Sequence, residues 1–234
     1  MRPALTRTLL AAGIAITVAC SSMRLAPEPG VSFHINFHQL SEQMRRQFSE
    51  DRVAVVERWQ DLLQEISAES EREQLLQVNE FFHRNVRYEI DERLYGVEDY
   101  WATPLETLGH GLGDCEDWAI AKYVSLRHLG IPDSKLRLIY VRAQIGGPRS
   151  PISQAHMVLG YYATPDAEPI ILDSLINTVL PASERTDLSP VFSFNADGLW
   201  MGQSSTPAPG SPTARLSLWR EVLERMQREG IQIQ

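Results

Sequence analysis

Apolar side chains recur at three- and four-residue steps along much of the first half of the chain. Over residues 41–66 the recurring positions are Val53, Val56, Trp59, Leu62, Leu63 and Ile66, and over residues 71–85 they are Leu75, Val78, Phe81 and Phe82. Each set forms one stripe on a helix, so the pattern predicts an amphipathic helix over each range. A third helix is predicted over residues 118–130, where WAIAKYVSLRHLG is closed by Gly130 and Pro132.

Strand patterns follow these helices. Residues 135–144 (KLRLIYVRAQ) alternate and are rich in β-forming residues, which predicts a strand. Two further β-type runs, 155–162 and 169–176, flank the turn-forming segment ATPDAE and predict a hairpin. If the loop is centred at 165–166, the positions of opposed residues add up to about 331. Helices followed by consecutive strands indicate an α+β domain with an antiparallel sheet.

The N-terminus has the pattern of an export signal. Arg2 and Arg7 precede an apolar run over residues 9–19 that is too short to span a bilayer. We therefore expect residues 1–20 to be a signal peptide and the protein to be periplasmic. Two outcomes stay open: cleavage after Ala19 releases a soluble protein, whereas lipoprotein processing would anchor the chain through Cys20.

The C-terminal part changes in composition. Residues 203–213 (QSSTPAPGSPT) are typical of a flexible linker. Residues 214–234 then begin with an amphipathic helical pattern, which we expect to dock on the main domain over residues 24–202; partner binding is the alternative. The formal charge of −8 and the isoelectric point of about 5.3 provide no basic cluster for phosphates, which excludes nucleic acid as a partner.

The motif GDCED at residues 113–117 places one of the two cysteines among three carboxylates. Cys115 lies just before the predicted helix 118–130, and unpaired amides at a helix N-terminus favour a thiolate. Asp114, Glu116 and Asp117 act in the opposite sense, because negative charge raises the pKa of a thiol. The cysteine is therefore either chemically idle or accompanied by a positive group that offsets these acids.

A nucleophilic cysteine needs a base, and the hairpin offers one. Among the six histidines, His156 begins a predicted strand, which is a rigid position. Asp173 ends the returning strand, within one step of the residue opposite His156 in the expected register. Cys115, His156 and Asp173 are thus a candidate triad. The alternative is a buried thiol, a hydrogen-bonded strand histidine and an aspartate that begins a turn.

Three segments carry a family resemblance. The stretch DYWATPLETLGHGLGDCEDWAIAKYVSLRHLGIP, followed by QAHMVLGYY and IILDSL, resembles the bacterial transglutaminase-like cysteine proteinase family over about residues 33–202. The resemblance implies a papain/transglutaminase-like fold with Cys115 as nucleophile, His156 as base and Asp173 as orienting carboxylate. Related enzymes use an upstream tryptophan as an oxyanion donor, which makes Trp101 a candidate; packing in the cleft wall is the alternative.

Within this family the chain looks like the periplasmic adhesin-cleaving members, and that resemblance implies a metal ion and partners. It implies Ca²⁺ on Asp114 and Glu116; Asp117 is either a third ligand or a helix cap. The implied substrate is a large surface adhesin, cut in its N-terminal region so that a biofilm is released. The implied regulator is an inner-membrane receptor for cyclic di-GMP that sequesters the protease. A transglutaminase or amidase and a non-catalytic calcium-binding module are the alternative functions.

Overall fold

The computed structural model describes residues 33–147 and 149–233 of the chain. The expected signal peptide and Cys20 lie outside these residues. Within the described part, none of the helices combines the length and the apolar character needed to cross a membrane.

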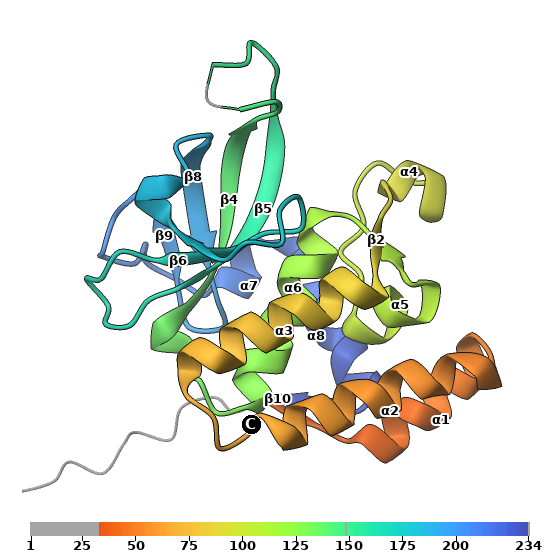
Figure 1. Ribbon diagram of the computed structural model, residues 1–234. Helices are drawn as coiled ribbons and strands as arrows, with labels where there is room; N and C mark the ends of the chain where they lie inside the picture. Colours follow the sequence, from red (N-terminus) through yellow and green to blue (C-terminus); the bar gives the residue numbers. More distant parts are fainter. Residues whose placement is uncertain (1–32, 148, 234) are drawn as a thin grey trace, which may run out of the picture.

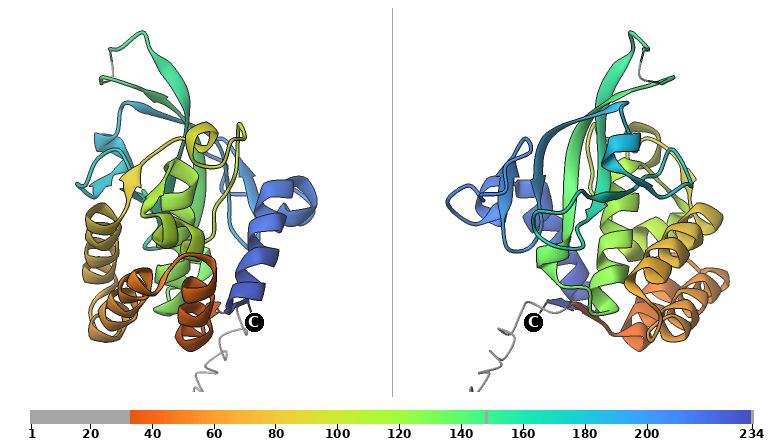
Figure 2. Two further views of the ribbon diagram at one scale, coloured as in Figure 1. Left: turned by 90° about the vertical axis from the view of Figure 1, so that its right-hand side faces the viewer. Right: turned by 60° about the vertical axis from the view of Figure 1, so that its left-hand side comes forward.

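Four longer helices form the N-terminal half. These are α1 (Phe37–Gln47), α2 (Glu50–Glu65), α3 (Glu71–Asn85) and α6 (Cys115–His128). Helix α6 lies between the sheet and α3 (Figures 1 and 2), so almost all of its side chains are buried. A buried hydrogen bond joins α6 to α2: the indole Nε1 of Trp59 donates to Ser125 Oγ at 3.0 Å. The start of α6 is therefore held rigidly in the centre of the molecule.

The sheet has six antiparallel strands in the order β7-β6-β5-β4-β8-β9. Their bounds are β4 (Leu136–Gln144), β5 (Ser153–Tyr161), β6 (Ile170–Leu172), β7 (Leu180–Pro181), β8 (Leu188–Phe194) and β9 (Leu199–Met201). Side chains alternate between two environments along the strands. Met157 and Leu159 belong to the main core with α6, whereas Val158 and Ile139 belong to a second, smaller apolar cluster.

Two small pairings close the molecule. Strand β1 (Phe33–Ile35) pairs with β10 (Ile231–Ile233), and β2 (Arg87–Tyr88) pairs in parallel with β3 (Leu112–Gly113). The second pairing brings the segment after β2, which includes α4 (Asp91–Leu94), next to the start of α6. The remaining short elements are α5 (Pro104–His110), η1 (Asp133–Lys135), η2 (Ala182–Glu184) and α7 (Pro212–Arg215).

The C-terminal helix α8 (Ser217–Glu229) packs on the domain rather than standing free. Its Trp219, Val222 and Met226 are fully buried, and the Trp219 ring meets that of Tyr123 in α6 edge-on at 5.9 Å. Figure 2 shows α8 and α3 on opposite sides of α6. The expected docking of this tail is thus observed.

The structure confirms the α+β class and the hairpin. Helix α3 has the bounds expected from its apolar stripe, and Leu159 pairs with Leu172, Gly160 with Ile171 and Tyr161 with Ile170, which is the expected register. Helix α6 starts at Cys115, three residues earlier than the apolar pattern indicated.

The single helix expected over 41–66 is wrong. The chain leaves helical geometry at Phe48, with φ −121° and ψ −89°. The Phe48 ring packs edge-on against His110 and lies over Gly109, where an added Cβ would come within 2.4 Å of it. The apolar stripe itself falls on α2, from Val53 to Leu63, whereas residues 41–47 belong to α1. The break between the two helices coincides with the tertiary packing of Phe48.

Candidate active site

The start of α6 is fixed by Asp117. Its Oδ1 accepts a hydrogen bond from the Ala102 amide at 2.7 Å, and its Oδ2 accepts one from the Asp114 amide at 3.2 Å. Gly113 makes room for this carboxylate, because an added Cβ would lie 2.8 Å from Asp117 Oδ2. Asp117 thus acts as a helix-capping residue, as in the capping alternative; its role as a metal ligand stays a prediction.

Cys115 is the first residue of α6 and is 8% exposed. Its thiol donates to Glu116 Oε2, with the two atoms 2.6 Å apart, and its sulfur accepts from the Met157 amide in β5. Burial raises the pKa of the Cys115 thiol well above its usual value, and the negative charges of Glu116 and Asp114 raise it further. In this arrangement the sulfur is therefore a protonated thiol held by Glu116.

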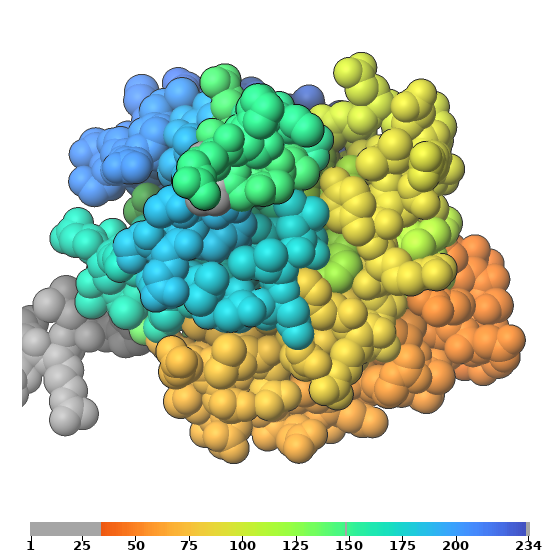
Figure 3. Space-filling view, turned by 45° about the horizontal axis from the view of Figure 1, so that its top comes forward, coloured from red at the N-terminus to blue at the C-terminus, as the bar shows by residue number. Residues whose placement is uncertain are grey.

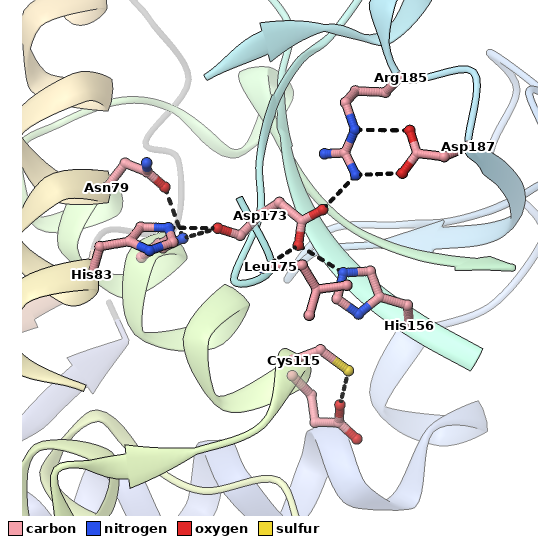
Figure 4. Close-up of polar contacts among 10 residues, drawn as sticks. Asn79, His83, Cys115, His156, Asp173, Leu175, Arg185 and Asp187 are labelled. Atoms are coloured by element: carbon pink, nitrogen blue, oxygen red, sulfur yellow. Dashed lines mark hydrogen bonds and ion pairs between the residues drawn. The ribbon is translucent and has the colours of Figure 1, made fainter. Parts of the chain in front are cut away.

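His156 and Asp173 form a buried pair beside this thiol. His156 Nε2 lies 2.7 Å from Asp173 Oδ1, and both residues are at most 3% exposed. An ionised carboxylate only accepts, so Nε2 carries the proton and Nδ1 is left as the free basic nitrogen. Since the amide of Met157 contacts the sulfur, His156 is the neighbour of the thiol, and Figure 4 shows its ring between Asp173 and Cys115.

The carboxylate of Asp173 has a partner for each oxygen. Oδ1 also accepts from the Leu175 amide at 3.0 Å, and Oδ2 accepts from Arg185 Nη2 at 2.7 Å. Burial alone would raise the pKa of Asp173, but the hydrogen bond and charge of His156, the Leu175 amide and Arg185 together lower it below its usual range. Asp173 is therefore ionised and can orient the imidazole.

The backbone carbonyl of Asp173 is held as well. Lys122 Nζ and His83 Nε2 both donate to it at 2.9 Å, and Lys122 Nζ donates to Asn79 Oδ1 at 2.8 Å (Figure 4). Burial lowers the pKa of Lys122 to about 7, an effect that Asp173 opposes. Lys122 is in α6, so the helix that carries Cys115 is bonded directly to the backbone of Asp173.

Five acidic side chains gather around the start of α6. Carboxylate oxygens lie within 4.8 Å of one another in two groups of three: Asp91, Asp114 and Asp117, and Asp91, Asp99 and Glu116. Two buried oxygens, Asp91 Oδ1 and Asp114 Oδ1, have no hydrogen-bond partner. Burial and then the charges of Glu116 and Asp117 raise the pKa of Asp114 to about 10, and burial raises that of Asp91 to about 6.

This donor set fits a hard divalent cation. Calcium binds six to eight oxygens and favours carboxylates, and here several converge while two buried oxygens lack a partner. Asp114 and Glu116, which the family resemblance implies as ligands, and Asp117, the possible third ligand, all belong to the cluster. Asp91 and Asp99 were missed, because only the β2–β3 pairing and the loop after α4 bring them there. In Figure 3 the light-green segment at the start of α6 shows in a seam between the yellow and cyan parts of the surface.

Trp101, the candidate oxyanion donor, packs in the core. It is 6% exposed, and its ring stacks on Phe194 with centroids 5.5 Å apart. Its carbonyl oxygen accepts a hydrogen bond from Arg225. These contacts fit the alternative in which Trp101 has a packing role. An oxyanion role for Trp101 stays a prediction.

Comparison with known proteins finds a matching family and similar solved structures. The family described as bacterial transglutaminase-like cysteine proteinase matches residues 46–189. Solved structures of LapG from Legionella pneumophila share 36% sequence identity with this chain and cover 82% of it.

These LapG structures are matched over nearly their whole length. The first is covered to 98% with a TM-score of 0.68, an EGTA-treated form to 98% with 0.71, and a calcium-bound form to 99% with 0.69. Curated proteins give no match. The family match spans more than half of the chain and includes Cys115, His156 and Asp173. The transglutaminase-like cysteine protease fold is thus confirmed, and the chain belongs to the bacterial transglutaminase-like cysteine proteinase family.

Proposed function

We propose that this protein is an exported, calcium-dependent cysteine endopeptidase that uses Cys115, His156 and Asp173. The observation that supports it most strongly is the position of Cys115. The thiol lies at the N-terminus of a buried helix and contacts the amide next to His156, whose ring is fixed by the ionised Asp173. This is the arrangement that nucleophilic cysteine catalysis requires.

The reaction assigns one role to each residue. His156 Nδ1 takes the thiol proton, and the sulfur attacks the carbonyl carbon of the scissile peptide. The oxygen of the resulting tetrahedral intermediate faces the α6 N-terminus, where the Cys115 amide is the expected donor. The intermediate collapses as His156 returns the proton to the leaving amine, which gives a thioester. Water activated by His156 then hydrolyses the thioester and regenerates the thiol.

The acidic cluster has a second role in this proposal. Asp114, Glu116, Asp91 and Asp99 would hold the calcium ion, whose charge offsets the acids that disfavour a thiolate. Glu116 is the present acceptor of the Cys115 thiol. Once the Glu116 carboxylate is engaged elsewhere, the thiol is left with His156 as its acceptor.

The substrate and the setting follow from the resemblance. The substrate would be a large surface adhesin, cut in its N-terminal region with release of a biofilm. The N-terminal pattern of Arg2, Arg7 and an apolar run supports a periplasmic location, either soluble or anchored through Cys20. An inner-membrane receptor for cyclic di-GMP would sequester the enzyme.

Cleavage of an adhesin fragment tests this function. The purified chain is incubated with an N-terminal adhesin fragment in calcium or in excess EGTA, with Cys115→Ala as control, and the products are identified by mass spectrometry. We expect two shorter fragments in calcium, and none in EGTA or with Cys115→Ala. Crosslinked products would identify an acyl transferase instead. An intact fragment together with calcium binding would favour a non-catalytic module.

A further inference from the structure

A pocket lies on the sheet face that carries the second apolar cluster. Its volume is about 400 Å³, which is within the range of small-molecule sites. Buried aliphatic side chains of three strands form its floor: Ile139 and Val141 from β4, Val158 from β5 and Ile171 from β6. The pocket is therefore suited to an apolar body.

Arg137 is the polar feature that sets this pocket apart. It lines the pocket from β4 and is 8% exposed. Its guanidinium lies 4.0 Å from the ring centre of Trp200 and 4.7 Å from that of Tyr162. No carboxylate of residues 33–147 or 149–233 forms an ion pair with it. Its side-chain hydrogen-bond partner is the hydroxyl of Tyr162, whose pKa is raised by burial, so this partner carries no negative charge. A buried guanidinium with neutral partners and no counter-ion is costly, so a bound anion would stabilise Arg137.

The pocket has two other charged residues, Arg185 and Asp166, and neither changes the position of Arg137 as the cation without a counter-ion. Arg185 also lines the pocket, and its charge is already compensated by two carboxylates: Nε and Nη2 bind Asp173 and Asp187, while Nη1 is buried without a hydrogen-bond partner. Asp166 lines the pocket too, but its side chain is exposed and forms no ion pair within the described residues. Arg137 is therefore the group to which an incoming anion would bind.

We propose that this pocket binds a small monocarboxylic acid with an aliphatic body. The carboxylate pairs with the Arg137 guanidinium, a planar fork that matches a carboxylate. The aliphatic body lies along the row formed by Ile139 and Val141, which follow Arg137 on the same face of β4. Neither Cys115 nor His156 lines the pocket, but Arg185 lines it and binds Asp173, so the pocket adjoins the proposed triad on the far side of that arginine.

Calorimetric titration with octanoate tests this proposal, since it needs no peptide substrate. We expect octanoate to bind with one-to-one stoichiometry, and octan-1-ol and octylamine to bind at least about tenfold more weakly, because they cannot form the charged pair. Equal affinities for octanoate and octan-1-ol would overturn the assignment of Arg137. The absence of heat and of any melting-temperature shift at millimolar octanoate would overturn the site itself.

Matched variants locate the binding. Arg137→Gln is expected to weaken octanoate binding at least about tenfold. Arg142→Gln, on the same strand but exposed and outside the pocket, is expected to leave binding unchanged. Ala182→Phe, which adds a ring on the partly exposed pocket wall, is expected to abolish binding while the melting temperature stays close to that of the parent. Parent-like binding by folded Arg137→Gln or Ala182→Phe would refute the proposal.

Discussion

Asp173 and Asp114 are both aspartates in the region of the proposed active site, but their surroundings are opposite. Every oxygen of Asp173 has a donor: His156, Leu175 and Arg185 bind the carboxylate, and Lys122 and His83 bind the carbonyl. Asp114 is surrounded by other acids, and its Oδ1 has no partner. The pKa of Asp173 is accordingly lowered, while that of Asp114 is raised to about 10.

The contrast divides the site into two halves: the Asp173 half, with His156 and Arg185, and the Asp114 half, with the neighbouring acids. It indicates which half is completed by protein groups alone. The Asp173 half is satisfied by protein groups and needs nothing further. In the part of the chain that the structure describes, no lysine or arginine forms an ion pair with the acids around Asp114, and such a cluster is stable either when it is protonated or when it binds a metal ion. The two halves should therefore respond differently to substitution, to calcium and to pH.

Removal of Asp173 should have the largest effect. Asp173→Ala leaves Arg185 buried with one partner fewer and leaves His156 without its orienting carboxylate. We expect the free energy of unfolding in urea to fall by about 3–5 kcal/mol and cleavage to be lost. Asp187→Ala, which removes only the more exposed partner of Arg185, should cost about 1 kcal/mol and leave activity measurable. If the two variants lost similar amounts of stability and activity, the role of Asp173 as the carboxylate that orients His156 would be contradicted.

Neutralisation of the acidic cluster should change stability in opposite directions with and without calcium. In EGTA, Asp114→Asn combined with Glu116→Gln should raise the free energy of unfolding by about 1–3 kcal/mol, because it removes acids that must either stay charged in a buried site or take up a proton on folding. In calcium the same change should lower it, because ligands are lost. Exposed Glu98 supplies the control, and Glu98→Gln should change neither value. A shift of the same sign and size in both buffers would refute the metal role of the pair.

Lys122 should make stability depend on pH in the alkaline range. Burial lowers its pKa from 10.5 to about 7, so between these values the unfolded chain binds one proton more than the folded chain. Stability should therefore rise with pH across this window, by about 1 kcal/mol per pH unit relative to Lys122→Met. Lys135→Met, which removes a partly exposed lysine paired with Glu71, is the control. If the parent and Lys122→Met have parallel pH profiles, Lys122 is charged in the folded protein.

The local parts of this site were predictable from sequence, and the long-range parts were not. The hairpin register follows from alternation and loop length, so the proximity of His156 and Asp173 was expected and is observed. The position of Cys115 at a helix start followed from the pattern after GDCED. Both inferences depend on residues that are close in sequence or joined by one turn.

The supporting groups come from distant elements. Arg185 lies in the loop before β8, His83 in α3 and Asp91 in α4, and only the packed molecule brings them to the site. Strands β8 and β9 were also missed; Pro190 interrupts the β pattern, and the register shifts between Tyr140 and Val141. The burial of Lys122 could have been predicted from one feature of the sequence: this lysine lies in a helix whose middle part is apolar on every side.

We propose that Glu116 couples the nucleophile to the calcium site, because it accepts the hydrogen bond of the Cys115 thiol and is also a proposed calcium ligand. The most direct measurement is the rate at which iodoacetamide alkylates Cys115, in a Cys20→Ser chain whose only thiol is Cys115. We expect faster alkylation in calcium than in EGTA, because Glu116, once it binds calcium, no longer accepts the hydrogen bond of the thiol. Equal rates in calcium and EGTA, in a protein shown to bind calcium, would contradict this coupling.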